Sequence, residues 1–411
     1  MIKNLVSKLP YFPFSTLALV PFKFRLGKNY QISSEYLYEL DSLSLVNLLD
    51  ALLHNLSNIK RYAEQSIPFY NKFYKYSNYF NCDLVDFDEW NSLPLLSKDD
   101  IRKSLFPFNG TYKINTGGTT GEPFSFYVDK YAWAREWAHM HFIWGLKGYH
   151  YTMPKITLRG KDLGSKLIQY NVIHNEFIVN TYKDFSERKN ALKLAELIKI
   201  RKIKFAHGYP SAIYNTFLEL QSSLNHSEIG EIKSFLKVAL FGSEFPVNYM
   251  TKYLDNFWGL DYISWYGHSE MCILAYDEHK NNNYIPFYSY GFPEVVNGEL
   301  IGTSYHNTDM PLIRYRTGDL VEGKYENGLL KSFSIKEGRS GDFIEDKSGK
   351  KIPLTGLIFG RHHKAFETFD YVQIRQTQPG QAVIYVTDKR GLFNQSIQSQ
   401  FDLSNVDIDF S

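Results

Sequence analysis

The sequence predicts an α/β fold with more than one domain. Three apolar segments, 203–207, 235–241 and 263–266, each have the pattern of a buried strand that ends in a polar or glycine-containing turn. Helical patterns alternate with these segments, and 411 residues are enough to bury a large core. In α/β folds ligands bind at the carboxyl ends of the strands, so functional groups are expected in the turns that follow.

The first hundred residues are predicted to be mostly helical. Apolar residues from Leu43 to Ala63 recur at helical spacing until Ile67-Pro68 ends the pattern. Ser97, followed three residues later by Asp100, is an N-cap signal for a further short helix. These helices are expected to serve packing.

A tryptophan- and histidine-rich helix is predicted over 129–147. His139 and His141 lie two residues apart and so face different ways, which argues against a metal site shared by the two. Near the C-terminus, 370–376 and 381–386 alternate between polar and apolar residues. They are expected to form paired strands of a small α+β unit.

Composition narrows the class of protein. Forty-six basic and 44 acidic residues give a net charge of +2, without the basic excess typical of nucleic-acid binding. The two cysteines, Cys82 and Cys272, suit a reducing compartment and do not form a disulfide framework or a zinc site. No apolar run is long enough for a membrane span, and the N-terminus lacks a signal-peptide pattern. The expected location is the cytoplasm.

Residues 113–123 form a glycine- and threonine-rich segment suited to binding phosphate. Glycines allow backbone N–H groups to converge on an anion, and threonine hydroxyls add donors. The segment lacks the Gly-x-x-x-x-Gly-Lys-Ser/Thr pattern, and a simple turn between two strands is the alternative interpretation. The candidate phosphate ligands are Thr116, Gly117, Gly118, Thr119, Thr120 and Gly121.

A second candidate segment is Tyr-Gly-His-Ser-Glu at 266–270. Tyr266 offers an aromatic face for a purine, Gly267 allows close backbone approach, and Glu270 offers a carboxylate. Mg²⁺ is commonly held by one or two carboxylates together with substrate phosphates, so Glu270 is the candidate metal ligand. The alternative is that Glu270 caps a following helix.

Two further segments carry groups for a ribose or a phosphate. Asp319, expected after a tight turn, can accept hydrogen bonds from two hydroxyls, although an Asx turn is the alternative. Arg339 lies between glycines and offers a rigid guanidinium fork, with a solvated hairpin as the alternative.

The order of these motifs resembles the adenylate-forming superfamily of acyl-CoA ligases and peptide-synthetase adenylation domains. Within it, the chain is most similar to the phenylacetate–CoA ligase branch and its CapK-like capsule-biosynthesis relatives. The resemblance runs from about Pro94 to the C-terminus and rests on five motifs in order. They are 116–123, 242–244, 266–270, 315–320 and 338–344.

The resemblance implies a large domain over 1–338, with its helical part at 1–100, and a small α+β lid over 339–411 that can be incomplete. It implies ATP and Mg²⁺ as cofactors, with CoA as a candidate. Besides the phosphate loop, it implies an adenine pocket of Gly242, Ser243 and Glu244 beside Tyr266 and Gly267. Asp319 would hold the ribose, Glu270 the metal, and Arg339 the ribose or phosphate. Tyr209, Pro210 and Ser211 would line the acyl pocket, and His268 would face the carboxylate or be structural.

Two departures from the superfamily pattern bear on activity. Gly117 stands where a hydroxyl residue is usual, so phosphate binding should weaken modestly. The lysine expected near the end of the lid is missing, because Lys389 is the last lysine and lies in a different context. Either the chain ends early or the protein adenylates poorly.

The leading hypothesis is an ATP-dependent ligase that activates a small carboxylic acid as an acyl adenylate. It would transfer the acyl group to a sugar amine or a thiol, in capsule or surface-polysaccharide biosynthesis. An aryl-acid CoA ligase of the phenylacetate type and a catalytically silent nucleotide-binding scaffold are the alternatives. No nucleic-acid partner is expected, and a homodimer is compatible with the resemblance.

Overall fold

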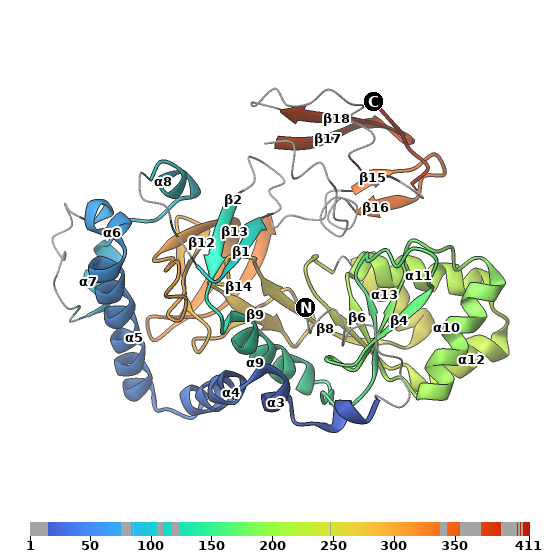
Figure 1. Cartoon of the computed structure of the whole chain (residues 1–411), viewed down its shortest axis with the longest axis horizontal. Coiled ribbons are helices and arrows are strands. Elements are labelled where there is room, and N and C mark those ends of the chain that lie inside the picture. The colour runs from blue at the N-terminus through green and yellow to red at the C-terminus, as the bar shows by residue number, and fades with distance from the viewer. Residues whose placement is uncertain are drawn as a thin grey trace.

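A computed structural model of the chain describes residues 15–74, 84, 86–104, 108, 110–116, 124–246, 248–337, 343–353, 371–387, 401, 403 and 406–411. Helices and mixed sheets follow one another along it, which confirms the predicted α/β class. Figure 1 shows a large sheet with its helices, a smaller sheet beside it, helices from the N-terminal part along the lower left edge, and the last strands above.

The N-terminal part is helical where it is described. The predicted helix from the leucine-rich segment is confirmed: it begins after the N-cap Ser44 and buries Leu52, Leu56 and Ala63. The capping box of Ser97 and Asp100 is also confirmed. The elements are η1 Ser15–Leu19, α3 Phe22–Leu26, α4 Lys28–Asp41, α5 Leu45–Ser66, α6 Pro68–Phe73, α7 Phe87–Ser92 and α8 Lys98–Arg102.

An eight-stranded sheet forms the centre of the fold, in the order β10-β9-β8-β7-β6-β3-β5-β4. Strands β5, β3, β6, β7 and β8 are parallel neighbours, so their carboxyl ends lie at one edge. The three predicted buried strands are confirmed as β6, β7 and β8. The strands are β3 Lys155–Leu158, β4 Ile168–Asn171, β5 Glu176–Val179, β6 Phe205–Gly208, β7 Val238–Phe241, β8 Asp261–Gly267, β9 Leu274–Asp277 and β10 Ile285–Pro286.

Helices cover this sheet and bury an apolar core against it. Phe217 and Trp258 meet edge to face within that core, which also contains Ile156 and Ala206 of the strands. The helices are α9 Ala132–Gly145, α10 Arg188–Arg201, α11 Pro210–Ser223, α12 His226–Phe235 and α13 Asn248–Trp258.

Four shorter sheets complete the described fold. The hairpin of β1 Tyr112–Thr116 and β2 Phe124–Val128 precedes α9. A four-stranded antiparallel sheet contains β11 Phe292–Val296, β12 Glu299–Thr303, β13 Tyr315–Glu326 and β14 Leu329–Glu337. The C-terminal strands are β15 Phe343–Glu345, β16 Lys351–Pro353, β17 Tyr371–Gln378, β18 Gln381–Thr387 and β19 Asp409–Phe410. The predicted pairing of the two alternating segments is confirmed by β17 and β18.

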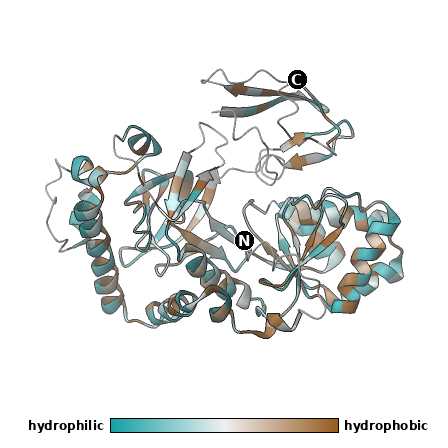
Figure 2. Cartoon of the chain, in the orientation of Figure 1, coloured by the Kyte–Doolittle hydropathy of each residue, from teal (hydrophilic) through white to brown (hydrophobic). Residues whose placement is uncertain are grey.

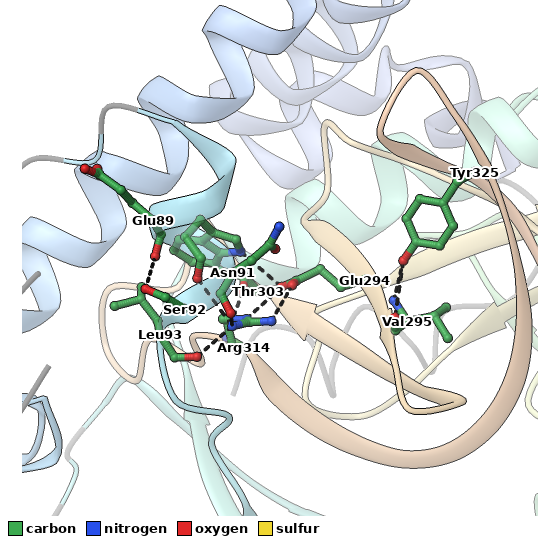
Figure 3. A network of polar contacts seen from close by, with 10 residues as sticks. Glu89, Asn91, Ser92, Leu93, Glu294, Val295, Thr303, Arg314 and Tyr325 are labelled. Atoms are coloured by element: carbon green, nitrogen blue, oxygen red, sulfur yellow. Dashed lines mark hydrogen bonds and ion pairs between the residues drawn. The ribbon is translucent and has the colours of Figure 1, made fainter. Parts of the chain in front are cut away.

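A buried ion pair joins the N-terminal helices to the four-stranded sheet (Figure 3). The Arg314 guanidinium pairs with the Glu294 carboxylate at 2.8 Å, and both side chains are less than a tenth exposed. Arg314 also donates to the backbone carbonyls of Asn91 and of Leu93, the latter at 2.6 Å, just after α7. The Trp90 indole donates to the same Glu294 carboxylate at 3.1 Å. Sheet and helices therefore share one set of charge-assisted hydrogen bonds.

Two histidines, the buried His139 and the partly buried His306, contact Ser289. His139 on α9 contacts the Arg135 carbonyl at 2.9 Å and the Ser289 hydroxyl at 2.8 Å, and His306 contacts the Ser289 carbonyl at 3.0 Å. Burial lowers the pKa of His139 and of His306 to about 4 in each case. His141 instead meets the Tyr30 hydroxyl at 2.8 Å, so the prediction that His139 and His141 face different ways is confirmed.

Acid should destabilise the fold through these histidines. Their folded-state pKa lies below the unfolded value of about 6.5, so the stabilisation is complete above that value and is lost as pH falls toward 4. Lowering the pH from about 7 to about 5 should reduce the unfolding free energy by about 2 kcal/mol for each histidine. Measured by urea unfolding, His139→Gln should lose less unfolding free energy between about pH 7 and about pH 5 than the wild type does. His226→Gln, at an exposed position, should keep the wild-type dependence of unfolding free energy on pH.

Arg314→Met should destabilise the fold by about 3–5 kcal/mol, because it leaves the buried Glu294 carboxylate without its charge partner. Thermal and urea unfolding measure the loss. Arg188→Met, which removes an exposed pair with Glu228, is the matched control and should unfold like the wild type. Equal unfolding of both variants would contradict the structural role given to Arg314.

Candidate functional site

Three of the predicted site segments follow neighbouring strands of the central sheet. Residues 209–211 follow β6, 242–244 follow β7, and 267–270 lie at the end of β8. Register places Gly208 beside Phe241 and Phe241 beside Ser264. The structure therefore brings these three segments together along one edge of the sheet.

Glu244 links the first two segments. Its carboxylate accepts a hydrogen bond from the Ser211 backbone N–H at 3.2 Å. The other oxygen, Oε1, is buried and has no hydrogen-bond partner among the residues that the structure describes. Burial raises the pKa of Glu244, against the opposing effect of the Ser211 hydrogen bonds. An orphaned oxygen of this kind suits a ligand that donates a hydrogen bond.

The backbone at Gly242 and Ser243 is tightly constrained. A Cβ on Gly242 would come within 2.0 Å of the Trp265 ring, so glycine is required there. Ser243 has a φ of 67°, in the left-handed region that is uncommon for residues other than glycine. Its hydroxyl contacts the Arg159 guanidinium at 3.2 Å, and that guanidinium lies 5.5 Å from the centre of the Tyr209 ring.

Tyr266 and Asp319 meet directly, although 53 residues separate them. The Tyr266 hydroxyl donates to the Asp319 carboxylate at 2.5 Å. Burial and the Asp319 charge raise the pKa of Tyr266 well above its ordinary value, so the phenol stays protonated and remains a donor. The Asp319 N–H donates to the Thr317 hydroxyl at 3.1 Å, which orients the backbone before the carboxylate.

The tight turn expected before Asp319 is wrong. Residues 316–319 lie within the long strand β13, and the pairing of β12 with β13 shifts its register between Glu299 and Ile301. Gly318 has a φ of 84° at this irregularity. A bulge with a glycine in the left-handed region has the same sequence signature as a turn, because both need positive φ.

Glu270 is the centre of a second polar cluster. Its carboxylate contacts the Tyr315 hydroxyl at 2.8 Å, His268 Nδ1 at 3.2 Å and the Lys98 ammonium at 3.3 Å. Burial raises the pKa of Glu270, but the hydrogen bond from His268, the Lys98 charge and the Tyr315 hydrogen bond outweigh it and lower the pKa overall. The carboxylate is therefore ionised at neutral pH.

The alternative role of Glu270 as a helix cap is wrong. No helix follows Glu270, because residues 268–271 form a turn closed by the Met271 N–H and the His268 carbonyl, and β9 begins at Leu274. His268 Nε2 accepts from the Ile273 N–H at 3.2 Å, so Nδ1 carries the proton and donates to Glu270. Since both ring nitrogens have partners in the protein, the geometry favours the structural alternative for His268.

The phosphate loop and the hinge arginine lie outside the described residues. These are Gly117, Gly118, Thr119, Thr120, Gly121 and Arg339. The backbone of Thr116 ends β1, opposite Phe124 of β2. Paired strands on either side of the segment are compatible with both interpretations, so its phosphate-binding role stays a prediction.

A cavity of about 880 Å³ opens beside the first segment, residues 209–211. Tyr209 and Ser211, predicted for the acyl pocket, line it, whereas Pro210 is buried as the first residue of α11. Asp346 and Lys350 of the C-terminal part form another wall, and the Lys350 ammonium pairs with Glu219 of α11 at 2.6 Å. Tyr266, Glu270 and Asp319 do not line this cavity.

Sequence reasoning missed three residues of the site: Lys98, Arg159 and Tyr315. Lys98 carried a usable signal, since a cation in the first turn of a helix opposes the helix dipole and suggests a partner outside the helix. That partner is Glu270. Tyr315 opens the 315–320 motif, but its contact with Glu270 could not be predicted because it joins distant segments. Arg159 carried no comparable signal.

Comparisons with known proteins agree with this architecture. No protein-family model matches the chain. Protein CapK of Staphylococcus aureus is 23% identical over 351 residues, which cover 80% of this chain and 76% of CapK. The open conformation of 2-hydroxyisobutyryl-CoA ligase, in complex with 2-HIB-AMP and CoA, has a TM-score of 0.54 at 15% identity, with 84% of this chain and 80% of that chain covered.

The thioesterification state of the same ligase, also with 2-HIB-AMP and CoA, has a TM-score of 0.53 at 16% identity and covers 84% of this chain and 79% of that chain. At such identities the likeness shows the fold. The resemblance predicted from the order of the motifs is thereby confirmed, and the chain has the fold of the adenylate-forming ligases.

Proposed function

We propose that the protein activates a small carboxylic acid with ATP and transfers the acyl group to an amine or a thiol. The observation that carries the proposal is the meeting of Tyr266 with Asp319, next to an ionised Glu270. Two sequence motifs that lie far apart are thus held by one hydrogen bond. Their meeting supports a single nucleotide site on the fold of the adenylate-forming ligases.

The described residues suit the parts of a nucleotide. The orphaned Glu244 Oε1 can accept from the amino group of a purine, and the Asp319 carboxylate can accept from ribose hydroxyls. Lys98 supplies positive charge beside Glu270, where phosphate charge would be held. In this proposal, Arg339 and residues 116–121 bind phosphate from outside the described structure.

Mg²⁺ would be held by the Glu270 carboxylate together with substrate phosphates, which commonly complete the coordination of this ion. The described residues contain no group of three or more side chains able to ligate a metal. When bound, the ion would neutralise phosphate charge. The low pKa of Glu270 fits this role, because the carboxylate needs no deprotonation before it binds a cation.

In the first step, a carboxylate oxygen of the acid attacks the α-phosphorus of ATP and the bond to the bridging oxygen breaks. Pyrophosphate leaves and an acyl adenylate forms. In the second step, an amine or thiol attacks the acyl carbonyl, loses its proton to solvent or a base, and AMP leaves. Tyr209 and Ser211, in the wall of the cavity, would contact the acid.

An amine acceptor in surface-polysaccharide assembly is what the resemblance to the CapK-like branch implies, and Protein CapK is a relative at 23% identity. The ligase structures that contain CoA support a thiol acceptor instead. Pyrophosphate exchange with a panel of acids, followed by product analysis with CoA and with amino sugars, separates the two. Nucleotide binding with no exchange for any acid would indicate the silent scaffold.

Asp319→Ala should weaken binding of AMP by about 10–100-fold, because charge-assisted hydrogen bonds to the ribose are lost. Tyr266→Phe keeps the aromatic face and should lose less affinity for AMP than Asp319→Ala does. Isothermal titration calorimetry with AMP measures both. Asp88→Ala, at an exposed position on α7, is the control, and equal affinity of Asp319→Ala and this control would remove the ribose role.

Glu270→Gln should lower the rate of Mg²⁺-dependent pyrophosphate exchange by about 100-fold, because the amide keeps the shape and loses the charge that binds the cation. Thermal unfolding serves as a check that the fold remains. Glu196→Gln, exposed on α10, should exchange at the wild-type rate. Undiminished exchange by Glu270→Gln would exclude the proposed metal role.

A further inference from the structure

We propose that the N-terminal patch, formed by Leu17, Leu19, Val20, Lys23 and Phe24, binds the surface of an anionic lipid bilayer. Phe24 is 71% exposed and Leu19 is 66% exposed, although both are large apolar side chains. Leu17 and Val20 add further exposed apolar surface within the same ten residues. Clustered apolar side chains of this kind mark interaction sites more often than single exposed ones do.

The patch is held in place by inward-facing neighbours. Ala18 and Phe22 are almost fully buried. The Arg25 guanidinium donates to the carbonyls of Val20 at 2.9 Å and Ile173 at 2.8 Å, so it ties η1 and α3 to the loop between β4 and β5. Because these anchors fix the backbone, the exposed side chains between them are presented to the surroundings.

Charge identifies the kind of partner. The first 34 residues contain five of the 46 basic residues and none of the 44 acidic ones, so the rest of the chain is net negative. Of the two described lysines in this region, Lys28 is exposed and Lys23 partly so. Apolar side chains flanked by cations, in a stretch of sequence without acidic residues, match acyl chains beneath anionic headgroups.

The geometry fits binding at the membrane surface. None of the helices in the described parts of the chain is long and apolar enough to cross a bilayer. Figure 1 shows η1 and α3 at the lower edge of the molecule, with the C-terminal strands at the opposite edge, and Figure 2 shows η1 as an apolar segment. A bilayer against the N-terminal patch would therefore leave the cavity beside the C-terminal strands accessible.

The test is flotation of the full chain with vesicles of phosphatidylcholine and with vesicles that also contain phosphatidylglycerol. Binding should require phosphatidylglycerol and fall with added salt. Leu19→Ser/Phe24→Ser should lower the partition coefficient by about tenfold or more. Lys23→Gln/Lys28→Gln should lower it by roughly twenty-five-fold, at about fivefold per cation.

Leu192→Ser/Ile200→Ser is the matched control, since both residues are exposed on α10, away from the patch, and should not alter binding. Equal binding to both vesicle types, or wild-type binding by both patch variants, would overturn the proposal. Sedimentation in the absence of lipid covers the alternative of a second copy. Self-association that Leu19→Ser/Phe24→Ser abolishes, with no vesicle binding, would also overturn it.

Discussion

The buried Arg314–Glu294 pair is the interaction on which the arrangement of the site depends. The Arg314 guanidinium donates to carbonyls in the last turn of α7 and just after it, and its own backbone bonds with Leu96: the Leu96 N–H donates to the Arg314 carbonyl at 2.9 Å. Two residues later comes Lys98, whose ammonium reaches Glu270. A charge taken out of water needs its full set of partners, so the strand and the helical segment are held in one register.

The candidate site depends equally on close backbone approach at the ends of parallel strands. Gly242 leaves room for the Trp265 ring, and Gly208, whose added Cβ would come within 1.9 Å of the Leu158 carbonyl, leaves room for β3. Ser243, directly after Gly242, has a left-handed backbone conformation. Because the backbone is tightly packed at this edge of the sheet, the neighbouring side chains have little freedom to move. This favours a preorganised ligand site.

Local patterns in the sequence predicted the local structure. Leucine spacing gave α5, Ser97 and Asp100 gave the start of α8, and short apolar runs gave β6, β7 and β8. Contacts between distant segments could not be predicted in this way. Arg159 and Tyr315 resemble any surface arginine or core tyrosine until the fold sets them against Ser243 and Glu270. The bulge before Asp319 was predicted as a turn because glycine permits both.

The wall of the large cavity that includes Lys350 has a consequence for how a bound molecule would act on the C-terminal strands. The pair of Lys350 with Glu219 lies at the surface, where such pairs contribute about 1 kcal/mol or less. A molecule that fills the cavity and touches both walls would add more attraction than this pair does. Ligand binding in the cavity and the position of the C-terminal strands would then be coupled. Each would change the equilibrium constant of the other by the same factor.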